Sequence, residues 1–210
     1  MRFAPRLVIM VKEPVAGRVK TRLARDIGVV AATSVYRSML GPICARLGRD
    51  PRWHTILAVS PDTALASRML PYANRRLAQG SGNLGQRLQR IFDTLPPGPV
   101  VVIGTDIPGI MPVDIARAFR AAGSHDAALG PSPDGGYWLV GLRRRPRVPR
   151  AFDRVRWSSI DALADTAANL SSLDVARLNV HDDVDDSSDL KRQSALIGRR
   201  ILPAVARARA

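Results

Sequence analysis

The chain has 210 residues, of which 46% are hydrophobic and 24% are charged, values typical of a globular domain. No apolar run approaches the ~18 residues of a membrane-spanning helix, and the first apolar segment is only as long as a strand. We therefore expect a cytoplasmic protein without a membrane span or a signal peptide. The single cysteine, Cys44, excludes an internal disulfide bond. The length and the lack of a linker or internal repeat favour one domain over residues 1–210.

The formal net charge of +14 raises the hypothesis of a nucleic-acid partner. Only Lys12, Lys20 and Lys191 are lysines, and the arginines are scattered along most of the chain. The densest run, Arg143–Arg145 with Arg147, has proline neighbours and no interleaved aromatic residues, so we interpret it as a solvated basic loop. A contact with nucleic acid or acidic lipid is the alternative for this run. The positive charge suits an anionic small-molecule substrate, and we expect no nucleic-acid partner.

Short β-rich runs alternate with longer helical patterns, which predicts an α/β fold with a mostly parallel sheet. In the first helical region, Gly28 and the pair Gly41-Pro42 are the places where a break is expected. Pro112 suits the first turn of a later helix. In the first part of the chain the patterns predict a strand over 7–11, a helical region over 20–47, a strand over 54–59, a helix after Pro61 to about 70, a helix over 84–95, a strand over 100–103 and a helix over 112–122.

The second part of the chain is less regular. Ser158 or Ser159 can cap a helix, and Asp186, Ser187 or Ser188 can cap another near the C-terminus. The predicted elements are short strands over 127–129 and 137–142, a helix to about 170, a last strand over 177–180 and a C-terminal helix that follows the cap.

A basic loop follows the first predicted strand. Lys12, Arg18, Lys20 and Arg22 lie within eleven residues, together with a proline and Gly17, and a helix is predicted to begin there. A loop whose backbone N–H groups can approach an anion, next to a helix N-terminus and several cations, is typical of a phosphate-binding site. The spacing of a Walker A loop is absent. A solvated basic turn is the alternative interpretation.

Carboxylates follow two other predicted strands. Asp106 comes directly after the buried strand 100–103, and the acidic stretch 182–186 follows the last strand. Because ligands bind outside the carboxyl ends of the strands in open α/β sheets, these groups could meet the basic loop at one edge. Carboxylates with substrate phosphates suit Mg²⁺, so the combination favours a nucleotide–metal complex. A turn or helix cap is the alternative for Asp106, and a solvated acidic turn with a cap is the alternative for 182–186.

A turn of Asp134-Gly135-Gly136 precedes Tyr137 and Trp138. Paired glycines permit close approach of a ligand to the backbone, and Asp134 could orient an acceptor hydroxyl or join a metal shell. The alternative is a hairpin turn whose aromatic side chains pack in the core, which we favour for Tyr137 and Trp138.

Four motifs, in order along nearly the whole chain, resemble the transferase group DUF2064. They are Lys-x-Pro-x-x-Gly-x-x-Lys-Thr-Arg-Leu at 12–23, Gly-Asn-Leu-Gly-Gln-Arg at 82–87, Gly-Thr-Asp-Ile-Pro-Gly at 104–109 and Pro-Asp-Gly-Gly-Tyr-Trp-Leu-Val-Gly at 133–141. Members of the group are named as radical-SAM/selenodomain-associated transferases or as glycosyltransferases linked to arsenosugar synthesis. The group is similar to the nucleotide-diphospho-sugar transferase superfamily, which includes 2-phospho-L-lactate and molybdenum cofactor guanylyltransferases. The resemblance implies a GT-A-like three-layer sandwich with a mostly parallel central sheet.

The resemblance also implies roles for particular positions. The metal ligands implied are Asp106 and the late pair Asp183 and Asp185. The loop before the middle helix would approach the base and ribose, and the basic loop would wrap the nucleotide phosphates. The residues implied in nucleotide binding are Lys12, Gly17, Arg18, Lys20, Arg22, Gly82, Asn83 and Gly85.

The hypothesis is a transferase dependent on Mg²⁺ (or Mn²⁺) in which Lys20, Arg18, Asp106 and Asp134 take part in catalysis. Four cations beside the phosphates favour a nucleoside triphosphate donor and nucleotidyl transfer to a small phosphorylated or hydroxyl acceptor. Glycosyl transfer from a nucleotide-sugar is the alternative, although most glycosyltransferases of this fold have an Asp-x-Asp after the central strand, where this chain has only Asp106. A further alternative is a nucleotide-binding protein without catalytic activity.

Overall fold

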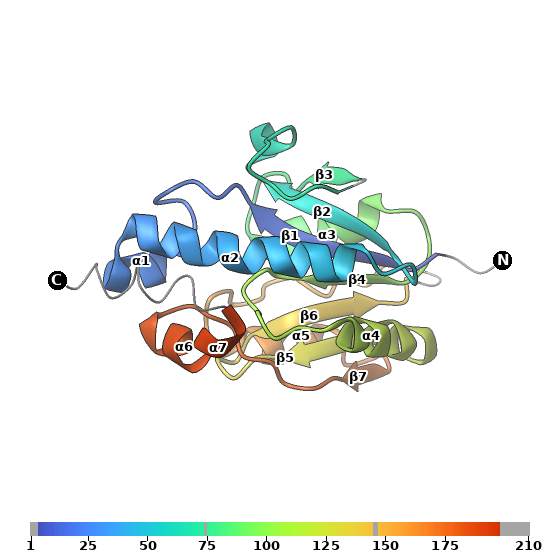
Figure 1. Cartoon of the computed structure of the whole chain (residues 1–210). Helices are drawn as coiled ribbons and strands as arrows, with labels where there is room; N and C mark the ends of the chain where they lie inside the picture. The colour runs from blue at the N-terminus through green and yellow to red at the C-terminus, as the bar shows by residue number, and fades with distance from the viewer. Residues whose placement is uncertain (1–3, 74, 145–146, 198–210) are drawn as a thin grey trace.

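The computed structural model describes residues 4–73, 75–144 and 147–197 of the chain. Its centre is a seven-stranded sheet with the order β3-β2-β1-β4-β6-β5-β7 (Figure 1). Only β6 runs antiparallel to its neighbours, so the sheet is mostly parallel, as predicted. The strands are β1 Arg6–Lys12, β2 His54–Ser60, β3 Arg76–Ala78, β4 Val100–Ile103, β5 Ala127–Pro131, β6 Tyr137–Leu142 and β7 Val175–Arg177.

Helices cover both faces of this sheet, which makes a three-layer α/β sandwich (Figure 1). One hydrophobic core lies between the sheet and α1, α2, α4, α6 and α7, and a second core lies against α3 and the end of α5. The helices are α1 Thr21–Ile27, α2 Val29–Gly48, α3 Leu84–Thr94, α4 Pro112–Ser124, α5 Ala162–Asn169, α6 Ser187–Arg192 and α7 Ser194–Ile197. Among the described residues, no helix is long and apolar enough to cross a membrane.

The central strands are apolar on both faces because both faces are covered. Along β1, Leu7 and Ile9 point into the first core and Val8 into the second. In the parallel register Leu7 pairs with Thr55 of β2 and with Val101 of β4. This register brings the loops after β1, β2 and β4 to the same edge of the sheet.

The first helical region breaks at one of the two predicted places. Gly28 has a φ of 82°, a conformation that favours glycine, and it separates α1 from α2. Pro42 lies inside α2 without ending it. Many residues of α2 are buried around this position, among them Met39 and Ile43, so tertiary packing holds the helix together despite the missing backbone N–H.

The predicted helix after Pro61 is wrong. Only a 3₁₀ turn, Asp62–Ala64, forms there, and turns follow it. The Arg76 guanidinium explains the difference, since it donates to backbone carbonyls of this segment that a helix would need. Those carbonyls are Leu65 O at 2.8 Å, Ser67 O at 2.9 Å, Leu70 O at 3.4 Å and Pro71 O at 3.0 Å.

Two predictions for the later elements need correction. Neither Ser158 nor Ser159 caps α5, whose N-cap is Asp161. The last strand ends at Arg177, earlier than predicted, although Leu178 N still donates to Leu129 O of β5 at 2.8 Å. The predicted cap at Asp186 is confirmed, because its side chain accepts from Ser188 N and Asp189 N.

The basic run beside β6 is not simply solvated. Arg144 is buried, and its guanidinium donates to the backbone carbonyls of Leu95, Pro96 and Gly98. It therefore fixes the turn between α3 and β4, a structural role that the sequence interpretation missed. Arg145 lies outside the described residues.

Candidate functional site

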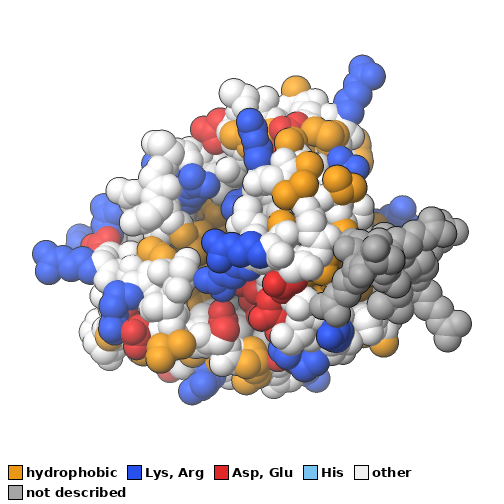
Figure 2. Space-filling model, turned by 90° about the vertical axis from the view of Figure 1, so that its left-hand side faces the viewer, with side chains coloured by type: hydrophobic (Ala, Val, Ile, Leu, Met, Phe, Trp, Pro, Cys, Tyr) orange, Lys and Arg blue, Asp and Glu red, His pale blue; other side chains and the backbone are white. Residues whose placement is uncertain are grey.

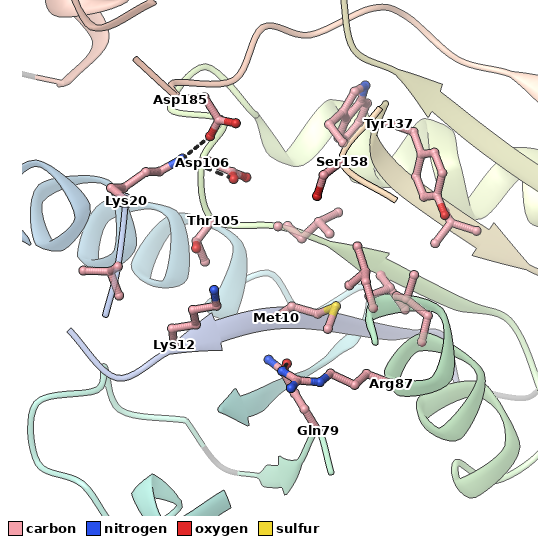
Figure 3. A pocket seen from close by; sticks show the side chains of 18 of the residues that line it. Met10, Lys12, Lys20, Gln79, Arg87, Thr105, Asp106, Tyr137, Ser158 and Asp185 are labelled. Atoms are coloured by element: carbon pink, nitrogen blue, oxygen red, sulfur yellow. Dashed lines mark hydrogen bonds and ion pairs between the residues drawn. The ribbon is translucent and has the colours of Figure 1, made fainter. Parts of the chain in front are cut away.

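A cavity of about 660 Å³ opens at the edge of the sheet where β1 and β4 end. At one end its lining is charged, with Lys12, Lys20, Arg22, Asp106 and Asp185. Figure 2 shows this side of the molecule, where Lys and Arg side chains meet Asp side chains near the centre. Figure 3 shows the interior of the cavity, with the charged residues at one end and the start of α3 at the other.

Lys20 lies at the centre of the charged end. It immediately precedes α1, has a left-handed backbone with a φ of 47°, and its side chain is only 7% exposed. Its Nζ donates to Asp106 Oδ2 at 3.3 Å and to Asp185 Oδ1 at 3.0 Å (Figure 3). Arg22, which is exposed, donates to Asp185 Oδ2 at 3.1 Å. The basic loop and two of the predicted metal ligands therefore face each other across one cleft.

Burial and charge act in opposite directions on these groups. Burial works against the charge on Lys20, but Asp106 and Asp185 outweigh it and raise the lysine pKa. The enclosed position of Asp106 likewise opposes ionisation, yet Lys20 and a backbone hydrogen bond keep the pKa of Asp106 below its usual value. Both groups are therefore charged at neutral pH.

Asp183 shows that the negative charge here is not fully compensated. Burial, followed by repulsion from Asp185, Asp106 and Asp134, raises the pKa of Asp183 to about 7. One oxygen each from Asp106, Asp183 and Asp185 lies within 4.8 Å of the others. Carboxylate oxygens are the ligands that Mg²⁺ and Mn²⁺ accept, so the residues present fit a hard divalent cation.

The backbone fixes this carboxylate cluster from two sides. Val184, which is fully buried, donates its N–H to the Asp106 carbonyl at 3.0 Å, and this bond places Asp183 and Asp185 next to Asp106. Gly104 leaves room for the Asp106 carboxylate, since a Cβ at this position would lie 2.6 Å from Asp106 Oδ1. Segments that are distant in the sequence are thus held in a defined arrangement.

Tyr36 of α2 fixes the start of the basic loop. Its hydroxyl accepts from Lys12 N at 2.9 Å and lies 3.1 Å from Lys12 O, to which it donates. Thr105, next to Asp106, donates to the same hydroxyl at 3.4 Å. The end of β1 and the loop after β4 are thereby linked through one buried side chain, which sequence reasoning did not identify.

The other end of the cavity begins at α3. Asn83 and Gln86 form a reciprocal capping box at the start of this helix, with distances of 3.0 Å and 2.9 Å. Gly82 has a φ of 98°, and a Cβ there would lie 2.2 Å from Gln86 Oε1. Gly82 and Asn83 line the cavity, as the predicted base and ribose contact requires.

Two further residues at this end were not predicted. Gln79 is buried, and its Nε2 donates to Val11 O at 3.2 Å and to Ala58 O at 2.8 Å. Arg87 donates to Gly82 O at 2.9 Å and to Gln79 Oε1 at 3.4 Å, and so holds the loop before α3. Arg87 stands in the motif at 82–87, which is the one sequence signal for it.

Four predicted site residues lie elsewhere. Gly17, with a φ of 78°, and the exposed Arg18 belong to the basic loop but not to the part of the cavity lining that the described residues form. Gly85 lies against Trp157, whose ring a Cβ would approach to 3.0 Å. Asp134 accepts from Gly136 N at 2.9 Å, the turn geometry given as its alternative, and contributes to the site through its charge near Asp183.

The aromatic residues after this turn differ in position. Trp138 is 4% exposed and donates to Asn179 O at 3.0 Å, which agrees with the core packing we favoured. Tyr137 is half-buried, and its ring lines the cavity while Trp157 packs edge-on against it.

Comparison with solved structures identifies the fold as that of the nucleotide-diphospho-sugar transferases. A Desulfovibrio desulfuricans G20 protein, proposed to be such a transferase, is 26% identical with a TM-score of 0.77, over 92% of this chain and 96% of that chain. For 4-diphosphocytidyl-2C-methyl-D-erythritol synthase from Anaerococcus prevotii DSM 20548 the values are 10% and 0.56, over 99% and 96% of the two chains. For Rv0371C from Mycobacterium tuberculosis H37Rv, in complex with manganese, they are 17% and 0.51, over 91% and 98%.

The family follows from the sequence itself. Residues 43–159 match the family described as "Uncharacterized protein conserved in bacteria (DUF2064)". This match spans more than half of the chain, and the chain belongs to the DUF2064 family. A comparison with curated proteins gave no match.

Proposed function

We propose that the protein is a transferase that binds a nucleoside triphosphate with a divalent cation and transfers the nucleotidyl group to a small phosphorylated or hydroxyl acceptor. The observation that carries the proposal is Lys20, which is buried between Asp106 and Asp185 at the mouth of the cavity. A structural core would rarely bring one lysine and several carboxylates to an open cavity, whereas phosphate and metal binding need both charges side by side.

In this proposal Asp106, Asp183 and Asp185 hold Mg²⁺ or Mn²⁺. The cation would supply charge neutralisation on the phosphate oxygens. Lys12, Lys20 and Arg22 line the same end of the cavity and bind the β- and γ-phosphates. An acceptor oxygen forms a bond to the α-phosphorus, the bond from that phosphorus to the bridging oxygen breaks, and pyrophosphate leaves. The protein contributes position and fixed positive charge.

The second candidate is glycosyl transfer from a nucleotide-sugar. It shares the cleft and the cation but releases a nucleoside diphosphate. Two observations favour nucleotidyl transfer. Three cations line the charged end of the cavity, which suits a triphosphate, and the loop after β4 offers a single carboxylate, Asp106. The fold also accommodates nucleotidyl transfer, since the synthase from Anaerococcus prevotii shares it.

A thermal-shift screen of the four nucleoside triphosphates and common nucleotide-sugars, with and without Mg²⁺, tests the proposal. A ligand at about 100 times its Kd stabilises the protein by roughly 2.7 kcal/mol, which is about 5–10 °C in Tm for a chain of this size. We expect a shift that needs both a triphosphate and the cation. Release of pyrophosphate in the presence of an acceptor panel supports nucleotidyl transfer, whereas release of nucleoside diphosphate from a nucleotide-sugar supports the second candidate. Binding without either product indicates a non-catalytic protein.

A further inference from the structure

The cavity has a second, apolar part beyond its charged end. We call this part the apolar bay, and its walls come from three strands and α3. Figure 3 shows Met10 and Tyr137 on two sides of it, with the start of α3 next to Arg87. Leu84, at the first position of α3, is 42% exposed although it is apolar. The residues of the bay are Met10, Leu84, Leu88, Val102, Tyr137 and Val140.

The polar side chains that border the bay are already engaged. Both groups of the Gln79 amide are bonded, to backbone carbonyls and to Arg87. The Tyr137 hydroxyl lies 3.3 Å from Thr166 Oγ1, and burial raises the pKa of this phenol well above its usual value, so it stays neutral. Trp138, deeper in the wall, donates its indole N–H to the backbone.

Ser158 is the exception at the entrance of the bay. Its side chain is exposed, lies between Asp106 and Tyr137 in Figure 3, and forms no hydrogen bond within the described part of the chain. The backbone at Ser158 is left-handed, with a φ of 61°. A single hydroxyl at the rim is therefore the polar group that remains for a ligand on this side of the cavity.

A ligand with many hydroxyl groups would lose its hydrogen bonds to water in this bay and regain few from the protein. Such a group costs about 1–3 kcal/mol when it is buried without a partner. An alkyl or aryl group loses nothing of this kind and gains roughly 25 cal/mol for each Å² that it removes from water. The surroundings thus discriminate by chemistry as well as by shape.

We infer that the second substrate, the one that accepts the nucleotidyl group, carries a compact alkyl or aryl group that occupies the apolar bay. This inference rests on the proposed function for the position of the nucleotide, because the phosphates and the cation then occupy the charged end. The reacting oxygen of the acceptor lies at the rim near Ser158, and its apolar group extends toward Met10 and Leu84. Polyhydroxylated sugars and their phosphates are disfavoured as acceptors.

Two probes of equal charge test the inference: phenyl phosphate and glycerol 3-phosphate. Protein labelled with ¹³C at the methionine methyl groups reports on Met10 directly, and Met10→Leu assigns its signal. We expect phenyl phosphate to move the Met10 signal and to bind at least about tenfold more tightly than glycerol 3-phosphate, since six ring carbons leave water. Each titration is run with the protein alone and with a saturating triphosphate and Mg²⁺.

A pair of matched variants locates the binding. Leu84→Gln places an amide at the rim of the bay and is expected to weaken phenyl phosphate at least about fivefold. Leu196→Gln makes the same change on α7, where Leu196 is 59% exposed outside the cavity, and should leave the affinity unchanged. Circular dichroism and Tm of both variants show that the fold is retained.

Three results would overturn the inference. They are equal or tighter binding of glycerol 3-phosphate, an equal loss in Leu84→Gln and Leu196→Gln, and a triphosphate that moves the Met10 signal and displaces phenyl phosphate. The last result would assign the bay to the nucleobase. The proposed function fails separately, when no triphosphate shifts Tm in the presence of Mg²⁺, whatever the two probes do.

Discussion

The two ends of the cavity are built by contacts of very different range. At the charged end, Lys20 pairs with Asp106 and Asp185, which lie 86 and 165 positions away in the sequence. At the α3 end, Asn83 and Gln86 cap a helix within three residues, and Arg87 bonds to Gly82 five residues away. Charge from distant segments is brought together only for a ligand, whereas local bonds serve the shape of the chain. Substitutions at the first end should therefore change function most, and those at the second end should change local stability.

The largest effect is expected for Asp106→Asn. The amide keeps the shape of the carboxylate but removes one negative ligand from the cluster. We expect the rate of product release to fall about 10²–10³-fold, the range for the loss of one preorganised electrostatic group. The Mg²⁺-dependent part of the thermal shift should also be lost. Asp165→Asn, at an exposed carboxylate paired with Arg156 outside the cavity, is the control and should retain the rate.

Lys20→Met sharpens the comparison because it separates stability from metal binding. Without the ammonium, Asp106 and Asp185 repel each other, and since both are about one-third exposed, we expect a loss of about 1–3 kcal/mol in unfolding free energy. Urea denaturation without divalent cations measures this loss. Titration with Mn²⁺ should show tighter binding than in the parent protein, because no ammonium competes for the carboxylates. Weaker Mn²⁺ binding in this variant would contradict a metal site.

The sequence identifies best the parts of the molecule that depend on short-range pattern. The strand 100–103 and the Asp106 that follows it are found because an apolar run and a turn suffice to place them. The predicted helix after Pro61 fails because Arg76 takes up its carbonyls, which no local pattern reveals. The role of Tyr36 is missed for the same reason, since a tyrosine on a buried helix face gives no sign of its contact with Lys12.

Gly104→Ala tests whether the position of the Asp106 carboxylate matters as well as its charge. A Cβ at Gly104 would lie 2.6 Å from Asp106 Oδ1, so the carboxylate must move away. We expect divalent-cation affinity to fall about tenfold, or about 1.4 kcal/mol, with the charge unchanged. Gly123→Ala in α4 is the matched control, because a Cβ there meets no atom within 4 Å. Isothermal titration with Mn²⁺ compares the two variants, and equal affinities would show that Gly104 has no part in placing Asp106.

The smallest effect is expected at the α3 end, from Asn83→Ala. The alanine removes the acceptor for Gln86 N and leaves one N–H at the helix start without its partner, which costs about 0.5–2 kcal/mol. Asn83→Ser keeps a capping oxygen and should recover most of this stability in urea denaturation. Cation affinity should be unchanged in both variants, because the charged end is fixed by Val184 and Lys20 and not by α3. A large loss of Mn²⁺ binding in Asn83→Ala, with stability retained, would show that the two ends are coupled and that the loop before α3 belongs to the metal and phosphate site.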